Sequence, residues 1–193
     1  MDTVHTLNSS MSHAPDDSAE KWPEPEFKQI FLQHHPRIVA VVLRLLGDPM
    51  RTEEVTNDAF MRLYQQPALG RAAANIPGWL YRTATNLGID ALRASARRVR
   101  YEGVAGKPDQ GTSTQSPLST VIAEEKRSRV RAALASIRPA QAQLLILRSH
   151  GLSYKELAEI LNLKPSGIGT MLNRAEAEFR ECYLQLHGSE EGL

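Results

Sequence analysis

Apolar residues recur at three- to four-residue spacing in three stretches of the first half of the chain, a pattern typical of helices with one buried face. The first stretch runs from Phe27 to Leu46 and stops at Gly47-Asp48-Pro49, which is typical of a helix end. In the second, Thr52 is a candidate N-cap, and Glu53 and Glu54 follow at the positive end of the helix dipole. The third begins after Pro77, where the spacing predicts buried Leu80, Ala84, Leu87 and Ala91 and outward-facing Arg82, Arg93 and Arg97.

The second half of the chain has the same helical period. We expect helices over about residues 121–136, 139–149, 153–161 and 166–186. No stretch shows the strict alternation of apolar and polar residues that a half-buried strand requires. The fold class predicted from the pattern is therefore all-α.

The segment from Leu152 to Ser166 has the features of a helix-turn-helix. Ser153 and Glu156 have the spacing of a capping box, and Ala158 is small where a second helix must cross closely. Asn162 tolerates the left-handed conformation that a tight turn needs, and Ser166 can cap the following helix. The pattern favours a helix that enters the major groove of DNA, although an αα-hairpin without a ligand has similar spacing.

A second candidate surface lies on the helix predicted after Pro77. Aromatic residues alternate there with cations and one amide, a combination that can stack unpaired bases and neutralise phosphates. The alternative is that Trp79 anchors the core and the arginines are a solvated face. The residues in question are Trp79, Tyr81, Arg82, Asn86, Arg93, Arg97 and Arg98.

The 193-residue chain has a net charge of only +1, but its charges are distributed unevenly and divide it into distinct segments. Residues 1–26 hold six acidic residues against one lysine and predict a disordered acidic tail. Residues 27–101 hold eleven basic against five acidic residues, a net of +6, and form the first unit. Residues 102–120 are rich in Gly, Pro, Ser and Thr and predict a flexible linker to a second unit at 121–186, followed by a tail at 187–193.

Composition also excludes several classes of protein. The single cysteine, Cys182, rules out an intramolecular disulfide and a multi-thiolate zinc site. The first residues lack the basic start and apolar core of a secretory signal, and the apolar runs are too short to span a membrane, so we expect a cytoplasmic protein without membrane insertion. We find no phosphate-binding loop, metal-ligand spacing or acid–base cluster, and predict no enzyme activity, no cofactor and no metal site.

Together these stretches resemble the bacterial sigma factors of the extracytoplasmic-function (ECF) group, in the sigma-70 family. The resemblance spans about residues 27–183 and includes the order and spacing of both units. In the first unit it rests on Glu53-Glu54-Val55, on Asp58 through Tyr64, and on Trp79-Leu80-Tyr81-Arg82 with Asn86-Leu87. In the second it rests on Leu144 to Arg148 and on Gly151 through Leu163.

The resemblance implies a sigma factor with two small helical domains, region 2 and region 4, that binds core RNA polymerase and directs promoter recognition, strand opening and transcription initiation. It implies polymerase contacts by Glu53, Glu54, Asp58, Arg62 and Tyr64. It implies contacts to the unpaired minus-ten element by Trp79, Arg82, Asn86, Arg93, Arg97 and Arg98. It implies contacts to the minus-thirty-five duplex by Lys164, Ser166, Thr170, Asn173 and Arg174.

The chain departs from the family pattern in the second helix of the helix-turn-helix. Gly169, Met171 and Glu176 stand where many members place basic residues, which predicts a smaller salt-dependent share of DNA affinity. An alternative reading is a helix-turn-helix regulator that binds promoter DNA without polymerase. The sequence also leaves open whether an anti-sigma factor is a further partner.

Overall fold

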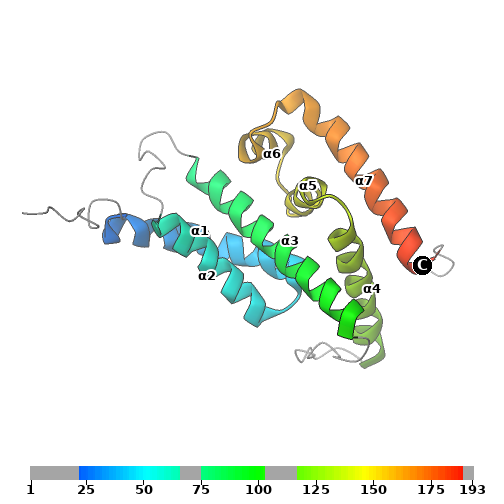
Figure 1. The fold of residues 1–193 in the computed structure, drawn as a ribbon. Coiled ribbons are helices and arrows are strands. Elements are labelled where there is room, and N and C mark those ends of the chain that lie inside the picture. The colour runs from blue at the N-terminus through cyan, green and yellow to red at the C-terminus, as the bar shows by residue number, and fades with distance from the viewer. Residues whose placement is uncertain (1–21, 66–74, 103–116, 189–193) are drawn as a thin grey trace, which may run out of the picture.

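The computed structural model describes residues 22–65, 75–102 and 117–188, and these parts of the chain fold into helices without a strand (Figure 1). The N-terminal unit contains α1 (Glu24–Leu46), α2 (Pro49–Gln65) and α3 (Ile76–Glu102). The C-terminal unit contains α4 (Pro117–Ser136), α5 (Pro139–Ser149), α6 (Tyr154–Leu161) and α7 (Pro165–His187). The all-α prediction is confirmed.

The ends of the first helices follow local sequence chemistry. Helix α1 begins three residues before Phe27, and Trp22 ahead of it is buried, so the ordered unit starts inside the stretch assigned to the acidic tail. Helix α1 ends at Gly47, whose φ of 70° is the left-handed conformation that glycine adopts at little cost.

The prediction that Thr52 caps the second helix is wrong. The Asp48 carboxylate accepts hydrogen bonds from the backbone N–H groups of Met50 (2.9 Å) and Arg51 (3.2 Å), so the helix starts earlier. Thr52 lies within the helix, buried, and its hydroxyl donates to the Asp48 carbonyl at 2.7 Å. Pro49, with its fixed φ and missing N–H, suits the first position of a helix.

Helix α4 begins at Pro117, within the stretch assigned to the linker. The rest of that stretch, from residue 103 to 116, lies outside the described residues, as do most of the acidic tail and part of the loop between α2 and α3. The remaining helices of the C-terminal unit agree with the periodicity to within one or two residues.

The two units pack against each other in the structure. Helix α3 contacts α4, α5 and α6 of the C-terminal unit as well as α1 and α2 of its own (Figure 1). Buried apolar side chains of both units, such as Leu80 and Ile89 in α3 and Leu144 and Leu147 in α5, belong to one connected hydrophobic cluster. Burial of such side chains stabilises the contact by an amount proportional to the apolar area removed from water. The sequence predicts two units but not this contact.

Candidate nucleic-acid interface

The helix-turn-helix begins with the predicted capping box. The Ser153 backbone N–H donates to the Glu156 carboxylate at 2.7 Å, and the Glu156 N–H donates to the Ser153 hydroxyl oxygen at 3.3 Å. The hydroxyl also donates to the carboxylate, at 2.6 Å, and this bond lowers the pKa of Glu156. The box satisfies donors at the start of α6 that would otherwise lack partners.

The turn between α6 and α7 has the predicted left-handed residue. Asn162 has φ 55° and ψ 48°, and its N–H donates to the Ala158 carbonyl. Helix α7 then starts at Pro165 with Lys164 as N-cap, so the prediction that Ser166 caps this helix is wrong. Ile168, Leu172 and Ala175 hold α7 in the core. The opposite face of α7 is therefore available to a ligand.

All of the side chains predicted to read duplex DNA are exposed. They share the outer face of the first part of α7 or its N-cap, and they are Lys164, Ser166, Thr170, Asn173 and Arg174. Tyr154 is also exposed beside this face. The Arg148 guanidinium lies 5.3 Å from its ring, and a Cβ added at Gly169 would lie 3.6 Å from a carbon of that ring. Sequence analysis did not single out Tyr154 as a member of this surface.

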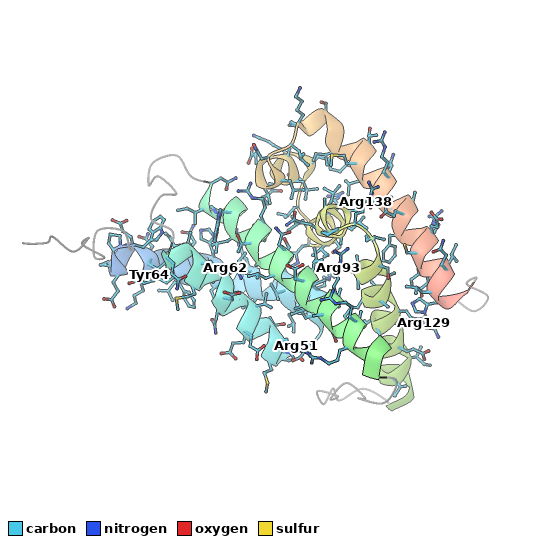
Figure 2. The ribbon with its side chains drawn as sticks, viewed as in Figure 1. Arg51, Arg62, Tyr64, Arg93, Arg129 and Arg138 are labelled. Carbon is cyan, nitrogen blue, oxygen red and sulfur yellow. The ribbon has the colours of Figure 1, made fainter. Side chains whose placement is uncertain are left out.

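Helix α2 presents a separate, mostly acidic surface. Glu53, Glu54, Asp58 and Arg62 are exposed, whereas Phe60 and Leu63 on the opposite face are buried. Asp58 and Arg62 form an ion pair at 3.1 Å one turn apart. Tyr64 is half-buried, with its ring 4.9 Å from that of Phe27. Figure 2 shows Arg62 and Tyr64 on α2, on the side of α3 away from α7.

The side chains predicted to hold unpaired bases lie along α3 but in three environments. Trp79 is half-buried and packs against the core, while Arg97 and Arg98 are exposed. Arg82, Asn86 and Arg93 instead hydrogen-bond groups of the C-terminal unit. The expectation that Arg82 and Arg93 point to solvent is therefore wrong for this arrangement, because both face α4–α6.

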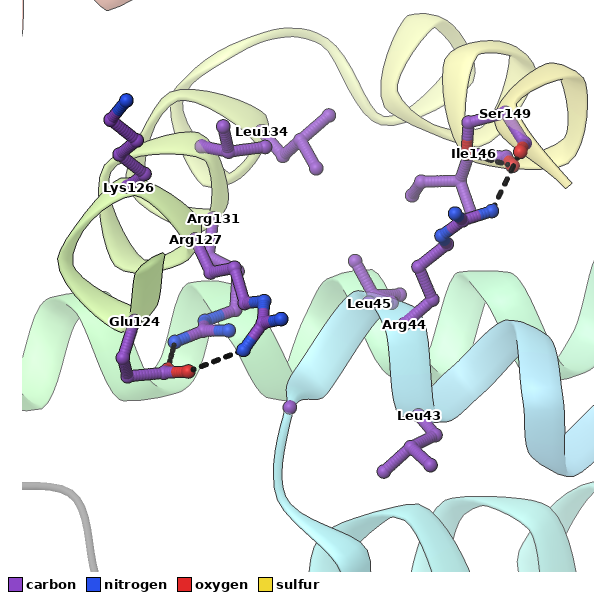
Figure 3. Close-up of a pocket in the computed structure, with 12 residues that line it drawn as sticks. Leu43, Arg44, Leu45, Glu124, Lys126, Arg127, Arg131, Leu134, Ile146 and Ser149 are labelled. Atoms are coloured by element: carbon purple, nitrogen blue, oxygen red, sulfur yellow. Dashed lines mark hydrogen bonds and ion pairs between the residues drawn. The ribbon is translucent and has the colours of Figure 1, made fainter. Parts of the chain in front are cut away.

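Two residues of this contact were missed by sequence reasoning, Gln143 in α5 and Arg44 in α1. The Gln143 amide donates to groups of α3, and the Arg44 guanidinium donates to the Ser149 carbonyl at 2.7 Å (Figure 3). Each interrupts an apolar stretch, Ala142-Gln143-Leu144 and Val42-Leu43-Arg44-Leu45. For Gln143, which is buried, a polar residue within an apolar helical face was the available signal, because burying it requires a partner. Arg44 is exposed, so this signal does not apply to it.

The described residues hold no group of His, Cys, Asp and Glu placed to bind a metal ion, and none of their helices is long and apolar enough to cross a membrane. Burial lowers the pKa of His150, at the end of α5, and the nearby Arg44 charge lowers it further. Both effects favour the neutral form of His150.

Comparison with known proteins gives two family matches that follow each other along the chain. Residues 30–98 match Sigma-70 region 2, and residues 127–179 match Sigma-70, region 4. The chain therefore belongs to the sigma-70 family, as an ECF sigma factor of RNA polymerase that directs transcription initiation. Membership of this family makes it a transcription initiation factor rather than an enzyme, as predicted.

Individual relatives agree with the family match. The chain is 27% identical over 178 residues to the ECF RNA polymerase sigma factor SigE of Mycolicibacterium smegmatis, covering 91% of this chain and 68% of the relative. It is 29% identical to SigL of Mycobacterium tuberculosis, covering 79% and 86%. It is 24% identical to SigW of Bacillus subtilis, covering 84% and 91%.

A solved structure, the sigma factor RpoE in complex with the anti-sigma factor NepR from Bartonella quintana, is 22% identical. The likeness covers 84% of this chain and 98% of that one, with a TM-score of 0.48.

Proposed function

We propose that the three surfaces described above divide the work of this sigma factor. The α2 surface docks on core polymerase, the α3 surface holds the unpaired minus-ten strand, and the outer face of α7 reads the minus-thirty-five duplex. We also propose that the protein acts in the cytoplasm, where its polymerase and promoter DNA are found. The match to region 2 over residues 30–98 disfavours the alternative of a regulator that works without polymerase.

The observation that carries the proposal is the shape of α7. This helix follows the turn at the left-handed residue Asn162. It buries one face through Ile168 and Leu172 and leaves its polar residues exposed together. Such a helix can enter a major groove with its N-terminal residues next to base edges. Lys164 and Arg174 can neutralise phosphates, while Thr170 and Asn173 can hydrogen-bond bases.

The chemistry of α3 supports a different role. Trp79 offers a partly exposed ring and Asn86 an amide, and Arg82, Arg93 and Arg97 lie on or near the same side of the helix, with Arg98 on another side. A stacking platform with cations beside it binds single strands, and each base stacked on such a platform is worth about 1–3 kcal/mol. The exposed acidic groups of α2 suit a basic partner surface instead of DNA, whose phosphates would repel them.

Two pairs of alanine substitutions in the holoenzyme test this division. Arg82→Ala with Asn86→Ala should impair strand opening, measured by permanganate reactivity of unpaired thymines, and leave binding to upstream duplex intact. Lys164→Ala with Arg174→Ala should weaken duplex binding and lower its salt slope by about one unit per lost phosphate contact. If the second pair abolished thymine reactivity on a pre-opened promoter and the first pair had no effect, the assignment would be reversed.

A further inference from the structure

The outermost face of α7 is uncharged. Ile168, Leu172 and Ala175 point into the core, and the main contacts of α7 are with α4, α5 and α6 (Figure 1). The residues on the opposite side of the helix recur at intervals of three or four positions and are all exposed. This outer stripe of α7 consists of Ser166, Thr170, Asn173 and Ala177.

Asn173 is the member of the outer stripe with a donor and an acceptor on separate atoms. Its carboxamide forms no hydrogen bond with the residues that the structure describes. Its neighbours one turn before and one turn after are Gly169 and Ala177, whose side chains are too small to shield it and have no polar atom. Asn86 on α3, by contrast, accepts a hydrogen bond from Gln143 at 3.0 Å. The Asn173 carboxamide is therefore available to a ligand.

A carboxamide distinguishes between the bases of duplex DNA. In the major groove adenine presents the N7 acceptor beside the 6-amino donor, and the amide of asparagine has the matching donor and acceptor. Guanine presents two acceptors at the same place, which suit the guanidinium of arginine instead. An asparagine that faces base edges therefore favours adenine and leaves one hydrogen bond unmade with guanine.

The residues around Asn173 are compatible with an A·T pair. The hydroxyl groups of Ser166 and Thr170 can donate or accept, so they impose no choice of base. The methyl groups of Thr170 and Ala177 suit the methyl group of thymine. The nearby cations, Lys164 at the N-cap and Arg174 beside the stripe, have long side chains suited to phosphates, and phosphate contacts carry no sequence information.

We propose that Asn173 is the specificity-determining residue of α7 and reads one adenine of the upstream duplex through its N7 and 6-amino groups. The promoters that this protein recognises then carry an A·T pair at that position. The proposal rests on the proposed function of α7 and adds the identity of a base to it. Lys164 and Arg174 supply affinity for the duplex, and Asn173 supplies selection.

The first test lets the holoenzyme select sequences from a duplex library with a randomised central segment. The native protein should enrich adenine at one position that Asn173→Ala leaves without a preference, while other positions stay unchanged. Asn173→Arg should prefer guanine at the same position, because a guanidinium matches two acceptors. Asn173 is exposed and alanine is the better helix former, so Asn173→Ala should fold normally.

Arg174→Ala is the matched control, since it changes the adjacent exposed residue of α7. Loss of a phosphate contact should weaken binding to all sequences about equally and leave the selected bases the same. A change of base preference in Asn173→Ala but not in Arg174→Ala therefore separates reading of a base from general affinity.

The second test replaces the selected adenine by 7-deazaadenine, which lacks the N7 acceptor but pairs normally with thymine. The Kd of the native holoenzyme for this duplex should rise about five-fold, the equivalent of one hydrogen bond. The Kd of the Asn173→Ala holoenzyme should not change. An effect of the modified base on DNA shape would weaken both proteins equally, so the comparison isolates the direct contact.

The inference is overturned if Asn173→Ala leaves every base preference unchanged or alters one at a position where the native protein does not select adenine. It is also overturned if Asn173→Arg still selects adenine there, or if 7-deazaadenine does not weaken the native protein more than Asn173→Ala. Failure of the proposed function has a different signature, because Lys164→Ala with Arg174→Ala would then leave the affinity for upstream duplex and its salt slope unchanged. If that pair weakens binding and the Asn173 variants keep the native preferences, α7 still binds the duplex and only the adenine assignment is rejected.

Discussion

The Arg93 guanidinium donates a 2.6 Å hydrogen bond to the carbonyl oxygen of Ile137, which follows the last turn of α4. The two residues are 44 positions apart and belong to different sigma regions. Figure 2 shows Arg93 on α3 facing the C-terminal unit. The bond therefore joins a cation proposed to bind one promoter element to the backbone of the unit proposed to read the other.

Charge reversal on α2 should weaken polymerase binding. Glu54→Arg combined with Asp58→Arg replaces two exposed acidic groups, so attraction to a basic partner becomes repulsion. The loss of the Asp58–Arg62 pair should cost the fold only about 0.5 kcal/mol, because the pair is solvent-exposed. Core-polymerase affinity by fluorescence titration and the melting temperature check both expectations.

The matched control for this prediction is Glu26→Arg with Asp90→Arg, which reverses two exposed acidic residues elsewhere in the same unit. It changes the net charge equally but leaves α2 untouched. Equal weakening by both double variants would show a general charge effect and remove the docking assignment from α2.

Replacing glycine by alanine should change the stability of the protein in opposite directions at Gly169, inside α7, and at Gly47, the C-cap of α1. At Gly169, inside α7, an added Cβ would lie 3.6 Å from the Tyr154 ring, an ordinary contact. Gly169→Ala should therefore stabilise the protein by about 0.5–1 kcal/mol. Gly47 has φ +70°, and an added Cβ would lie 2.5 Å from an Arg131 side-chain nitrogen, so Gly47→Ala should destabilise it by about 1–2 kcal/mol. Urea unfolding measures both; the same sign at both sites would contradict the prediction.

The capping box should make Ser153 more important for folding than Ser166. Ser153→Ala removes the N-cap of α6 and should lower the free energy of unfolding by about 1 kcal/mol. Ser166→Ala should leave stability nearly unchanged, because the N-cap of α7 is Lys164. Denaturant titrations of the two variants give the comparison, and a larger loss at Ser166 would count against the capping assignment.

The stabilisation by Ser153 should depend on pH. Its hydrogen bonds hold the pKa of Glu156 below the ordinary value, so the ionised carboxylate is favoured in the folded state. A lowered folded pKa contributes stability that is present above about pH 5 and is lost as the pH falls through that pKa. The difference in stability between the native protein and Ser153→Ala should therefore shrink on acidification. A difference that grew at acid pH would have the wrong sign.

Adding a basic residue on α7 should strengthen duplex binding. Glu176 is exposed on α7, so Glu176→Lys removes repulsion from phosphates and adds one contact. The affinity for upstream duplex should rise, and the slope of log K against log salt should steepen by about one unit. Glu181→Lys, about 7.5 Å farther along α7 and on another face, is the control and should change the slope less. Filter binding over a salt series measures both.

The sequence by itself determined the helices, the capping box, the left-handed Asn162 and the family. These features depend on neighbours three or four residues away or on the order of motifs along the chain. Neither requires knowledge of contacts between distant residues. The helix starts at Thr52 and Ser166 were predicted wrongly, because Asp48-Pro49 and Lys164-Pro165 provide competing local starts.

Only the tertiary structure decided which way Arg82, Asn86 and Arg93 face. Their helical spacing is the same whether they meet DNA, solvent or another helix, so no periodicity distinguishes these cases. The outcome depends on carbonyl groups at the ends of α4 and α6 and on the Gln143 amide, which lie 42 to 78 residues away along the chain. Packing of α3 against the C-terminal unit brings them within hydrogen-bond distance, and that long-range contact is the information the sequence pattern lacks.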